Sequence, residues 1–377
     1  MTLQTLLTSK DDSTAEMLIR VLAELGVAVD RSTAVDVATS RLQEERFDQV
    51  IVDFDDSDSA RLLLEACRDV TGPERNSPVT VALVPNPSQI RSILGAGAHF
   101  VLVKPVTTEQ ARNTFRTATA VLRRERRMSF RVAVQAPISI RTSDGSVVEG
   151  ILLDLSKGGL DVLAANPLPK ATGVKVNFEI PNGGITIDAE AEVAWCNANG
   201  QVGLRFLNMT GNTTMQFDDW LTARLHEALP DEPESTTENK LTDLSLGGCY
   251  VETESPFPQN SAIDLCLADT GMEIKTAGLV RVMHPGHGMG IEFSAASPEQ
   301  RRDVGQFIEF LTIDPAANPK LEISPRALVA STAELRGSAD ADSDDALLEL
   351  LRDGSSLEQD AFLNALREQR TALAVSE

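Results

Sequence analysis

The sequence lacks long apolar runs and has few cysteines. No apolar stretch in its 377 residues approaches the about 18 that a membrane-spanning helix needs, which argues against membrane insertion. No basic residues precede the first apolar ones, so we expect no signal peptide. Its four cysteines, Cys67, Cys196, Cys249 and Cys266, form no CxxC pair, which favours reduced thiols in a cytoplasmic protein over a disulfide framework or a zinc site.

Positive charge is also scarce, and the common catalytic motifs are missing. A formal net charge of −22 argues against a nucleic acid polymer as a partner. The motifs GxxxxGK[ST], HExxH and GxSxG do not occur, and the many carboxylates single out no catalytic pair, so we expect no enzyme and no cofactor. His284-Pro-Gly-His287 suggests a metal site, but Pro-Gly between two strands is ordinary turn chemistry, and the turn is favoured.

Residues 1–122 alternate short apolar strands with amphipathic helices. This alternation predicts a doubly wound α/β domain with a parallel sheet. Its last helix is expected to begin near Thr108 and to run into an arginine-rich segment without a break. The strands are expected at Leu3–Leu7, Val27–Val29, Val50–Val52, Val79–Val84 and Phe100–Val103.

An internal repeat follows, in which apolar and polar residues alternate as in antiparallel strands. Asp154-Leu-Ser-Lys-Gly-Gly159 returns about 90 residues later as Asp243-Leu-Ser-Leu-Gly-Gly248. Gly203-Leu-Arg-Phe206 likewise returns as Gly290-Ile-Glu-Phe293. Two copies of one unit rich in antiparallel β-strands are therefore expected. The second lacks both the arginines and the first strand ahead of its motif, so we expect it to be truncated.

The expected domain boundaries follow from these patterns. The α/β domain (1–122) precedes the first β-rich unit (123–228), a polar linker (229–239) and the second β-rich unit (240–313). After these, the chain is acidic and rich in alanine and serine, which predicts a disordered linker at 314–343.

A helical hairpin is expected at 344–371, where it would dock on the protein's own body or on a partner. Gly354 would end its first helix, and a capping box that begins at Ser356 would open the second.

The segment Arg123-Arg-Glu-Arg-Arg-Met-Ser-Phe-Arg131 is a basic cluster in an otherwise acidic chain. A solvated helix end, with cations near the negative pole of the helix dipole, explains it without any ligand. The cluster also suits a small anion, because each guanidinium presents a planar fork of hydrogen-bond donors.

Arg127-Met-Ser-Phe-Arg131, followed by Asp154-Leu-Ser-Lys-Gly-Gly159, resembles the RxxxR and [D/N]xSxxG signature of the PilZ family of cyclic di-GMP receptors. In this family, arginines would bind phosphate oxygens or the O6/N7 edge of guanine, and the aspartate would accept from guanine N1–H and N2–H. The serine would contact phosphate or brace the loop, and the glycines would permit positive φ and a close approach to the ligand. The resemblance implies that each β-rich unit is an antiparallel β-barrel. It also implies a ligand site made of Arg126, Arg127, Arg131, Asp154, Ser156, Gly158 and Gly159.

The DxSxxG motif also has a reading that needs no ligand, as an Asx-type turn between two strands. We favour ligand binding for the first copy. The turn is favoured for the second copy, because no arginines precede Asp243.

The N-terminal domain resembles a response-regulator receiver. Asp53 has the place of the phosphoacceptor at a strand end, and Lys104-Pro105 matches the family's lysine and proline, the latter usually after a cis peptide bond. The family's magnesium-binding acidic pair falls on Ser9-Lys10, with Asp11-Asp12 displaced, and its hydroxyl after the fourth strand falls among Ala82–Val84. Phosphoryl transfer needs that metal and that hydroxyl, so a pseudo-receiver is expected.

Three functions are compatible with these patterns. The favoured one is a bacterial signalling receptor that binds cyclic di-GMP and relays its level to an unidentified downstream protein. The family implies control of motility, adhesion or exopolysaccharide. The alternatives are a phosphorylation-dependent response regulator and a ligand-free PilZ scaffold, and a homo-oligomer is compatible with all three.

Overall fold

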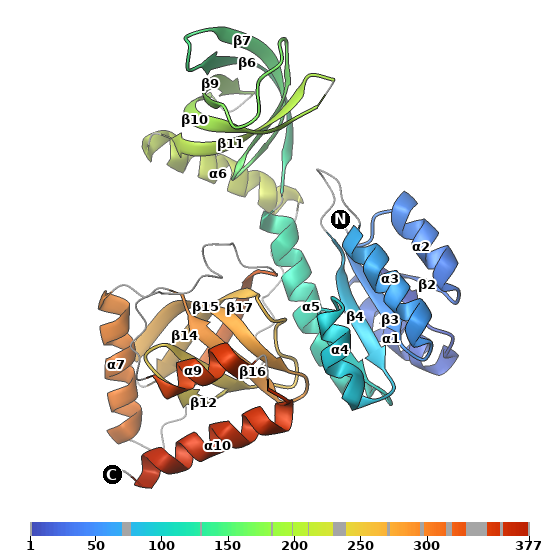
Figure 1. Ribbon diagram of the computed structural model, residues 1–377. Helices are drawn as coiled ribbons and strands as arrows, with labels where there is room; N and C mark the ends of the chain where they lie inside the picture. The colour runs from blue at the N-terminus through green and yellow to red at the C-terminus, as the bar shows by residue number, and fades with distance from the viewer. Residues whose placement is uncertain are drawn as a thin grey trace. The chain divides into compact units, whose positions relative to one another are not determined.

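The computed structural model describes residues 2–69, 77–128, 130–181, 184–197, 199–209, 211–228, 239–269, 272–294, 298–313, 319–328, 345–354 and 357–375. The chain forms two compact units (Figure 1). One unit spans residues 126–233, and the other combines residues 2–125 with residues 234–377.

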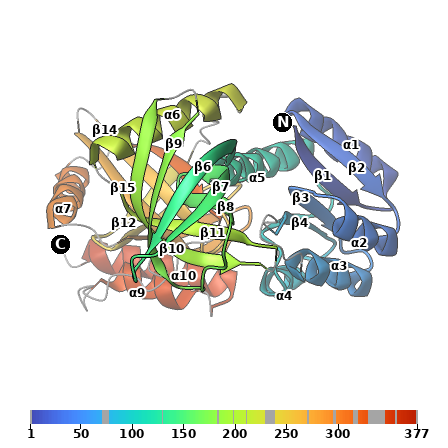
Figure 2. The same ribbon diagram turned by 90° about the horizontal axis from the view of Figure 1, so that it is seen from above.

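The N-terminal domain is an α/β domain with a parallel sheet, as the sequence predicts. The sheet has five strands in the order β2-β1-β3-β4-β5. Helix α1 covers one face of this sheet, and α2 and α3 cover the other (Figure 2). The strands are β1 (Leu3–Thr8), β2 (Val27–Ser32), β3 (Gln49–Asp53), β4 (Val79–Val84) and β5 (Phe100–Val103). The helices are α1 (Asp12–Glu24), α2 (Val35–Glu44), α3 (Ser57–Asp69), η1 (Pro87–Gln89), α4 (Ile90–Gly95) and α5 (Thr108–Met128).

The first β domain is a closed antiparallel barrel in the order β10-β11-β8-β7-β6-β9. Alternate residues of each strand point inward, and Ile138, Leu152 and Val176 are among the buried ones. Helix α6 packs on β10, and its Phe217 ring meets Phe206 edge to face at 6.0 Å. The elements are β6 (Val132–Thr142), β7 (Val147–Ser156), β8 (Gly159–Ala164), β9 (Gly173–Ile180), β10 (Ile185–Cys196), β11 (Gln201–Met209) and α6 (Gly211–Ala228).

The second β domain repeats this arrangement with a six-stranded sheet in the order β12-β13-β16-β15-β14-β17. An isolated antiparallel bridge between Asn239 and Leu321 joins its two outer strands. The elements are β12 (Lys240–Leu244), β13 (Gly248–Glu252), β14 (Ala262–Asp269), β15 (Met272–His284), β16 (Gly288–Phe293), α7 (Pro298–Ile313) and β17 (Lys320–Ala327).

Strand β17 takes the place in the second barrel that β6 has in the first. Leu321 of β17 pairs with Leu267, and Ile138 of β6 pairs with the corresponding Phe178. Ile138 also pairs with Gly150, at the position of Asn239 in the second copy. The second β domain therefore has six strands like the first but in permuted order, because its sixth strand comes from the C-terminal side of α7.

This strand corrects two expectations. The second copy is not truncated, and residues 320–327 within the range 314–343 form a strand rather than a disordered linker. Leu321 and Ile323 point inward and are buried, but this alternation is short and Pro325 follows it, which weakens the strand signal in the sequence. The other residues of that range, apart from 319 and 328, lie outside the described part of the chain, as does most of the linker 229–239.

The second barrel packs on α5 within the same compact unit. Thr114 and Thr117 of this helix are buried, and Thr117 Oγ1 donates to the Ser255 carbonyl at 3.4 Å. Asn113 Nδ2 donates to Glu254 at 2.7 Å. One face of α5 therefore contacts the second barrel, while its Phe115 and Ala118 lie in the apolar core.

The C-terminal hairpin consists of α9 (Ala346–Asp353) and α10 (Gln359–Val375) and packs on the second barrel (Figure 1). Gly354 follows the first helix as expected. Ser356, the expected start of the capping box, lies outside the described residues.

Candidate functional site

The arginine segment lies where helix α5 gives way to strand β6. Arg126 and Arg127 are in the last turn of α5, near its negative pole. The Phe130 amide donates to the Arg127 carbonyl at 3.3 Å, and Arg131 immediately precedes β6. The RxxxR segment thus spans a helix end and the turn into the barrel, while Ser129 lies outside the described residues.

Arg131 and Asp154, which are far apart in the sequence, meet in the structure. The guanidinium donates to Asp154 Oδ1 at 2.9 Å. The side chains of Arg131 and Asp154 are 45% and 18% exposed, so this ion pair is open to solvent. Such a pair is worth about 0–1 kcal/mol, and a ligand can separate it at little cost.

The first motif loop is a tight turn between β7 and β8. Ser156 pairs with Gly159 across this turn, and Ser156 Oγ donates to the Gly159 carbonyl at 3.1 Å. Ser156 is buried. Of the two roles expected for this serine, the structure shows the brace of the loop.

The positive φ expected of the two loop glycines is absent, while their close approach to a ligand stays a prediction. Neither Gly158 nor Gly159 has a positive φ. A Cβ on Gly159 would lie 2.1 Å from the Leu204 carbonyl oxygen, so this glycine allows β11 to approach. Gly158 is exposed, and a Cβ there would meet nothing within 4 Å. Gly159 is therefore required for strand packing, whereas Gly158 is open to solvent.

Asp161 lies next to Asp154 in the structure and was missed by motif reasoning. It pairs with Asp154 across β7 and β8, so the two carboxylates share one face of the sheet. Asp161 is 3% exposed, its Oδ2 accepts from Gln201 at 2.6 Å, and its Oδ1 accepts no hydrogen bond from the described residues. Burial raises the pKa of this carboxyl, against the Gln201 hydrogen bond, and the charge on Asp154 adds to the rise. An aspartate two positions beyond the motif glycine was the available signal.

The second motif loop keeps the brace but not the arginines. Ser245 Oγ donates to the Gly248 carbonyl at 3.3 Å, as Ser156 does in the first copy. In the permuted barrel, the residues before β17 read Asp314-Pro-Ala-Ala-Asn-Pro319. The connection that would hold an arginine segment in this copy therefore contains none.

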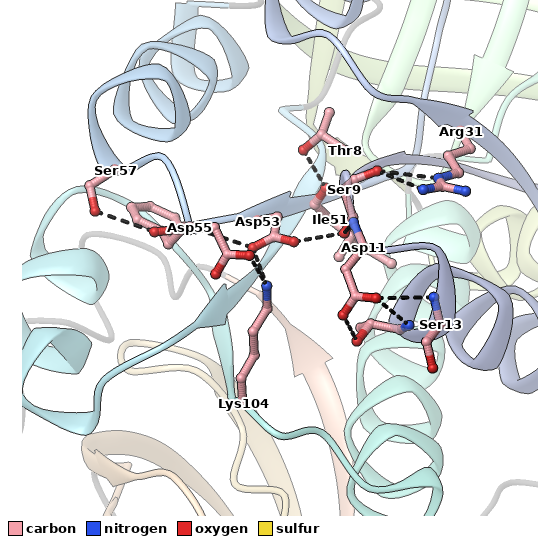
Figure 3. Close-up of polar contacts among 12 residues, drawn as sticks. Thr8, Ser9, Asp11, Ser13, Arg31, Ile51, Asp53, Asp55, Ser57 and Lys104 are labelled. Carbon is pink, nitrogen blue, oxygen red and sulfur yellow. Dashed lines mark hydrogen bonds and ion pairs between the residues drawn. The ribbon is translucent and has the colours of Figure 1, made fainter.

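The expected phosphoacceptor is fully engaged within the receiver-like domain (Figure 3). Asp53 Oδ2 accepts from Ser9 Oγ at 2.7 Å, and Asp53 Oδ1 accepts from Lys104 Nζ at 2.6 Å. Lys104 also pairs with Asp55 at 2.8 Å, and the Lys104-Pro105 bond is cis, as the resemblance implies. Burial lowers the pKa of Lys104, but the hydrogen bonds to both carboxylates outweigh it and raise this pKa overall. Lys104 therefore stays a cation.

The displaced acidic residues have other roles. Asp11 is the N-cap of α1 and accepts from the Ser13 amide at 3.0 Å, while its hydrogen bonds from the Thr14 side chain and amide lower its pKa. Asp12 pairs with Arg31 at 2.6 Å. In the described structure, neither carboxylate contacts Asp53, and the end of β4 offers no hydroxyl among residues 82–84.

His284 and His287 have different surroundings. Tyr250 Oη and His284 Nδ1 lie 3.1 Å apart in the interior, and burial lowers the pKa of His284 to about 4. His287 belongs to the turn, where its amide donates to the His284 carbonyl. The structure thus gives the turn that the sequence favours.

The fold and the two motif loops define a modular chain with two related barrels. Residues 125–223 and 225–310 each match the PilZ domain family. The chain therefore contains two PilZ domains behind a receiver-like domain. PilZ domains typically bind cyclic di-GMP.

One curated relative is the cellulose synthase catalytic subunit (UDP-forming) of Xanthomonas axonopodis pv. citri (strain 306). It is 29% identical over 106 residues, which are 28% of this chain and 14% of the relative. The chain thus spans only a small part of that enzyme.

Solved structures resemble the individual domains. The PilZ domain of CeSA from a cellulose-synthesizing bacterium is 21% identical and covers 26% of this chain and 99% of its own, with a TM-score of 0.22. The PilZ domain with c-di-GMP of YcgR from Escherichia coli is 18% identical and covers 27% and 96%, with a TM-score of 0.21. A response regulator from Thermotoga maritima is 18% identical and covers 31% and 98%, with a TM-score of 0.28.

Among the described helices, none combines the length and the apolar character needed to cross a membrane.

Proposed function

We propose that the chain is a non-catalytic signalling receptor that binds cyclic di-GMP on its first PilZ domain. The observation that supports this proposal best is the ion pair between Arg131 and Asp154, next to the loop that the Ser156 hydrogen bond stabilises. Binding exchanges one weak ion pair for several charge-assisted hydrogen bonds, each worth about 1.5–3 kcal/mol. Arg131, with Arg126 and Arg127, turns to phosphate or to guanine O6/N7, and Asp154 turns to guanine N1–H and N2–H.

The two motif aspartates provide an internal test of this proposal. Asp154→Ala is expected to weaken cyclic di-GMP binding about tenfold, because it removes the acceptor for guanine donors. Asp243→Ala is the matched control and is expected to leave affinity unchanged, since its copy has no arginine segment. Asp161→Asn is measured in the same calorimetric series. Weaker cyclic di-GMP binding by this variant would place the Asp161 carboxylate in the site. Equal losses from Asp154→Ala and Asp243→Ala would instead indicate two working nucleotide sites.

Helix α5 is the proposed route from the ligand to a downstream protein. Arg126 and Arg127 are on its last turn, while Phe115 and Ala118 on the same helix are buried. When ligand phosphates order Arg126 and Arg127, they therefore also order the end of a helix that is part of the receiver-like domain.

Hydrogen exchange tests this route. Amides at 119–128 are expected to exchange at least about threefold more slowly with cyclic di-GMP, because the ligand suppresses fraying of the helix end. Arg131→Ala at the same ligand concentration is the control. Protection confined to strands β6–β8 would argue against relay through α5.

The alternative function, a phosphorylation-dependent regulator, is disfavoured because Ser9 and Lys10 replace the magnesium-binding acidic pair and the Ser9 hydroxyl donates to Asp53 Oδ2.

A further inference from the structure

The hairpin α9–α10 covers the outer face of the second barrel beside its motif loop. Helix α9 contacts β13, β15 and β16. The Phe362 ring of α10 lies 5.7 Å from Tyr250 and 4.7 Å from His284. The hairpin and the barrel share a buried apolar cluster made of Tyr250, Val282, Leu347, Leu351, Phe362 and Leu366.

A carboxylate at the start of α9 contacts the motif loop directly. Asp345 Oδ2 accepts from the Gly247 amide at 2.9 Å, while Asp345 Oδ1 caps α9 by accepting from the Leu348 amide at 3.0 Å. Gly247 corresponds to Gly158, the exposed glycine of the first loop. In the second copy, a carboxylate of the chain itself thus accepts from the amide of the glycine that is exposed in the first copy.

Both barrels have a glycine at the same position, but different side chains cover it. Gly203 pairs with Trp195 in the first barrel, and the corresponding Gly290 pairs with Val282 in the second. A Cβ on Gly203 would lie 2.1 Å from Trp195 Nε1, so the barrel's own indole covers this glycine. A Cβ on Gly290 would lie 2.2 Å from Leu351 Cδ2. The smaller valine therefore leaves a hole that α9 fills.

The barrels also differ in charge at the edge of this face. Glu292 in the second barrel is 3% exposed and lies between Arg281 and Arg352 of α9, with Arg352 Nη2 2.6 Å from Glu292 Oε1. The corresponding residue of the first barrel is Arg205, which pairs with Glu192 at 2.8 Å. An arginine at this position would repel Arg352.

We infer that the motif face of the second PilZ barrel is a recognition site for the chain's own C-terminal hairpin, with the Asp345 carboxylate in the place of an anionic ligand. Val282 leaves room for Leu351 and Glu292 pairs with Arg352, so the hairpin binds this barrel. Trp195 and Arg205 close the same face of the first barrel to the hairpin. This recognition goes beyond nucleotide binding and does not depend on it.

Hydrogen exchange on the full-length chain tests the inference. Val282→Trp places the first barrel's indole in the hole for Leu351, and Arg352→Glu sets two carboxylates against each other. Each variant is expected to speed exchange of the α9 amides Leu347–Asp353 at least about tenfold, with the amides of β13 and β16 unchanged. Glu349→Arg, an equally large charge change on the exposed side of α9, is the matched control. It should speed exchange only slightly, through the cation it places in the first turn of the helix.

The hairpin assignment is overturned if α9 exchange is unchanged in both variants, or if Glu349→Arg speeds it equally. Adding cyclic di-GMP to the wild type gives a second arm. Unchanged α9 exchange supports an occupied second loop, whereas faster exchange would show that nucleotide competes with Asp345 there. Failure of the chain to bind cyclic di-GMP would appear in calorimetry and would leave the Val282→Trp and Arg352→Glu results intact.

Discussion

Replacing Arg131 or Arg127 with alanine is expected to weaken cyclic di-GMP binding at least about tenfold, which corresponds to about 1.4 kcal/mol. Each guanidinium can make two parallel hydrogen bonds to phosphate or to a guanine edge, and one charge-assisted bond is worth about 1.5–3 kcal/mol. Part of the loss at Arg131 is offset, because the wild type must first give up its ion pair with Asp154. Tenfold is therefore a conservative value.

Isothermal calorimetry on the purified full-length protein measures this effect. Arg141→Ala is the matched control, because Arg141 is an exposed arginine on the same strand β6 but far along it from Asp154. It should bind like the wild type. Unchanged affinity in both Arg127→Ala and Arg131→Ala would show that the RxxxR segment is a solvated helix end and not a ligand site.

The sequence predicts the elements of this site well where the signal is local. The DxSxxG turn depends on neighbouring residues, and it joins two antiparallel strands, β7 and β8, as the motif predicts. The motif spacing also brings Arg131 and Asp154 together. Asp161 was missed because its importance comes from cross-strand pairing with Asp154, which no short motif records.

The parts that sequence reasoning missed depend on contacts between distant segments. Strand β17 could not be recognised from its own residues. Its Leu321 and Ile323 pair with β14 of a sheet whose other strands all lie before α7 in the sequence. The reason why the hairpin packs on the second barrel is that Val282 stands where the first barrel has Trp195. This correspondence follows only from the register of β10 with β11 and of β15 with β16. Such information belongs to packing, not to local propensity.

At the receiver-like domain, acetyl phosphate with magnesium is expected to leave Asp53 unmodified. Phosphoryl transfer needs a metal to neutralise charge and orient the phosphoryl group, and the expected carboxylate pair is Ser9-Lys10 here. The Asp53 oxygens are instead held by the Ser9 hydroxyl and by the Lys104 cation. Intact-mass measurement after incubation checks this expectation, with Asp53→Asn as the control for modification elsewhere.

A gain-of-function variant makes this expectation sharper. Ser9→Asp combined with Lys10→Asp restores the acidic pair and removes the hydroxyl that holds Asp53 Oδ2. With magnesium present, this double variant is expected to acquire at least about tenfold more phosphoryl label than the wild type, and Asp53→Asn should abolish the gain. Stoichiometric labelling of the wild type at Asp53 would show that Lys104 alone supports the chemistry. The receiver-like domain would then be a phosphorylation switch in its own right.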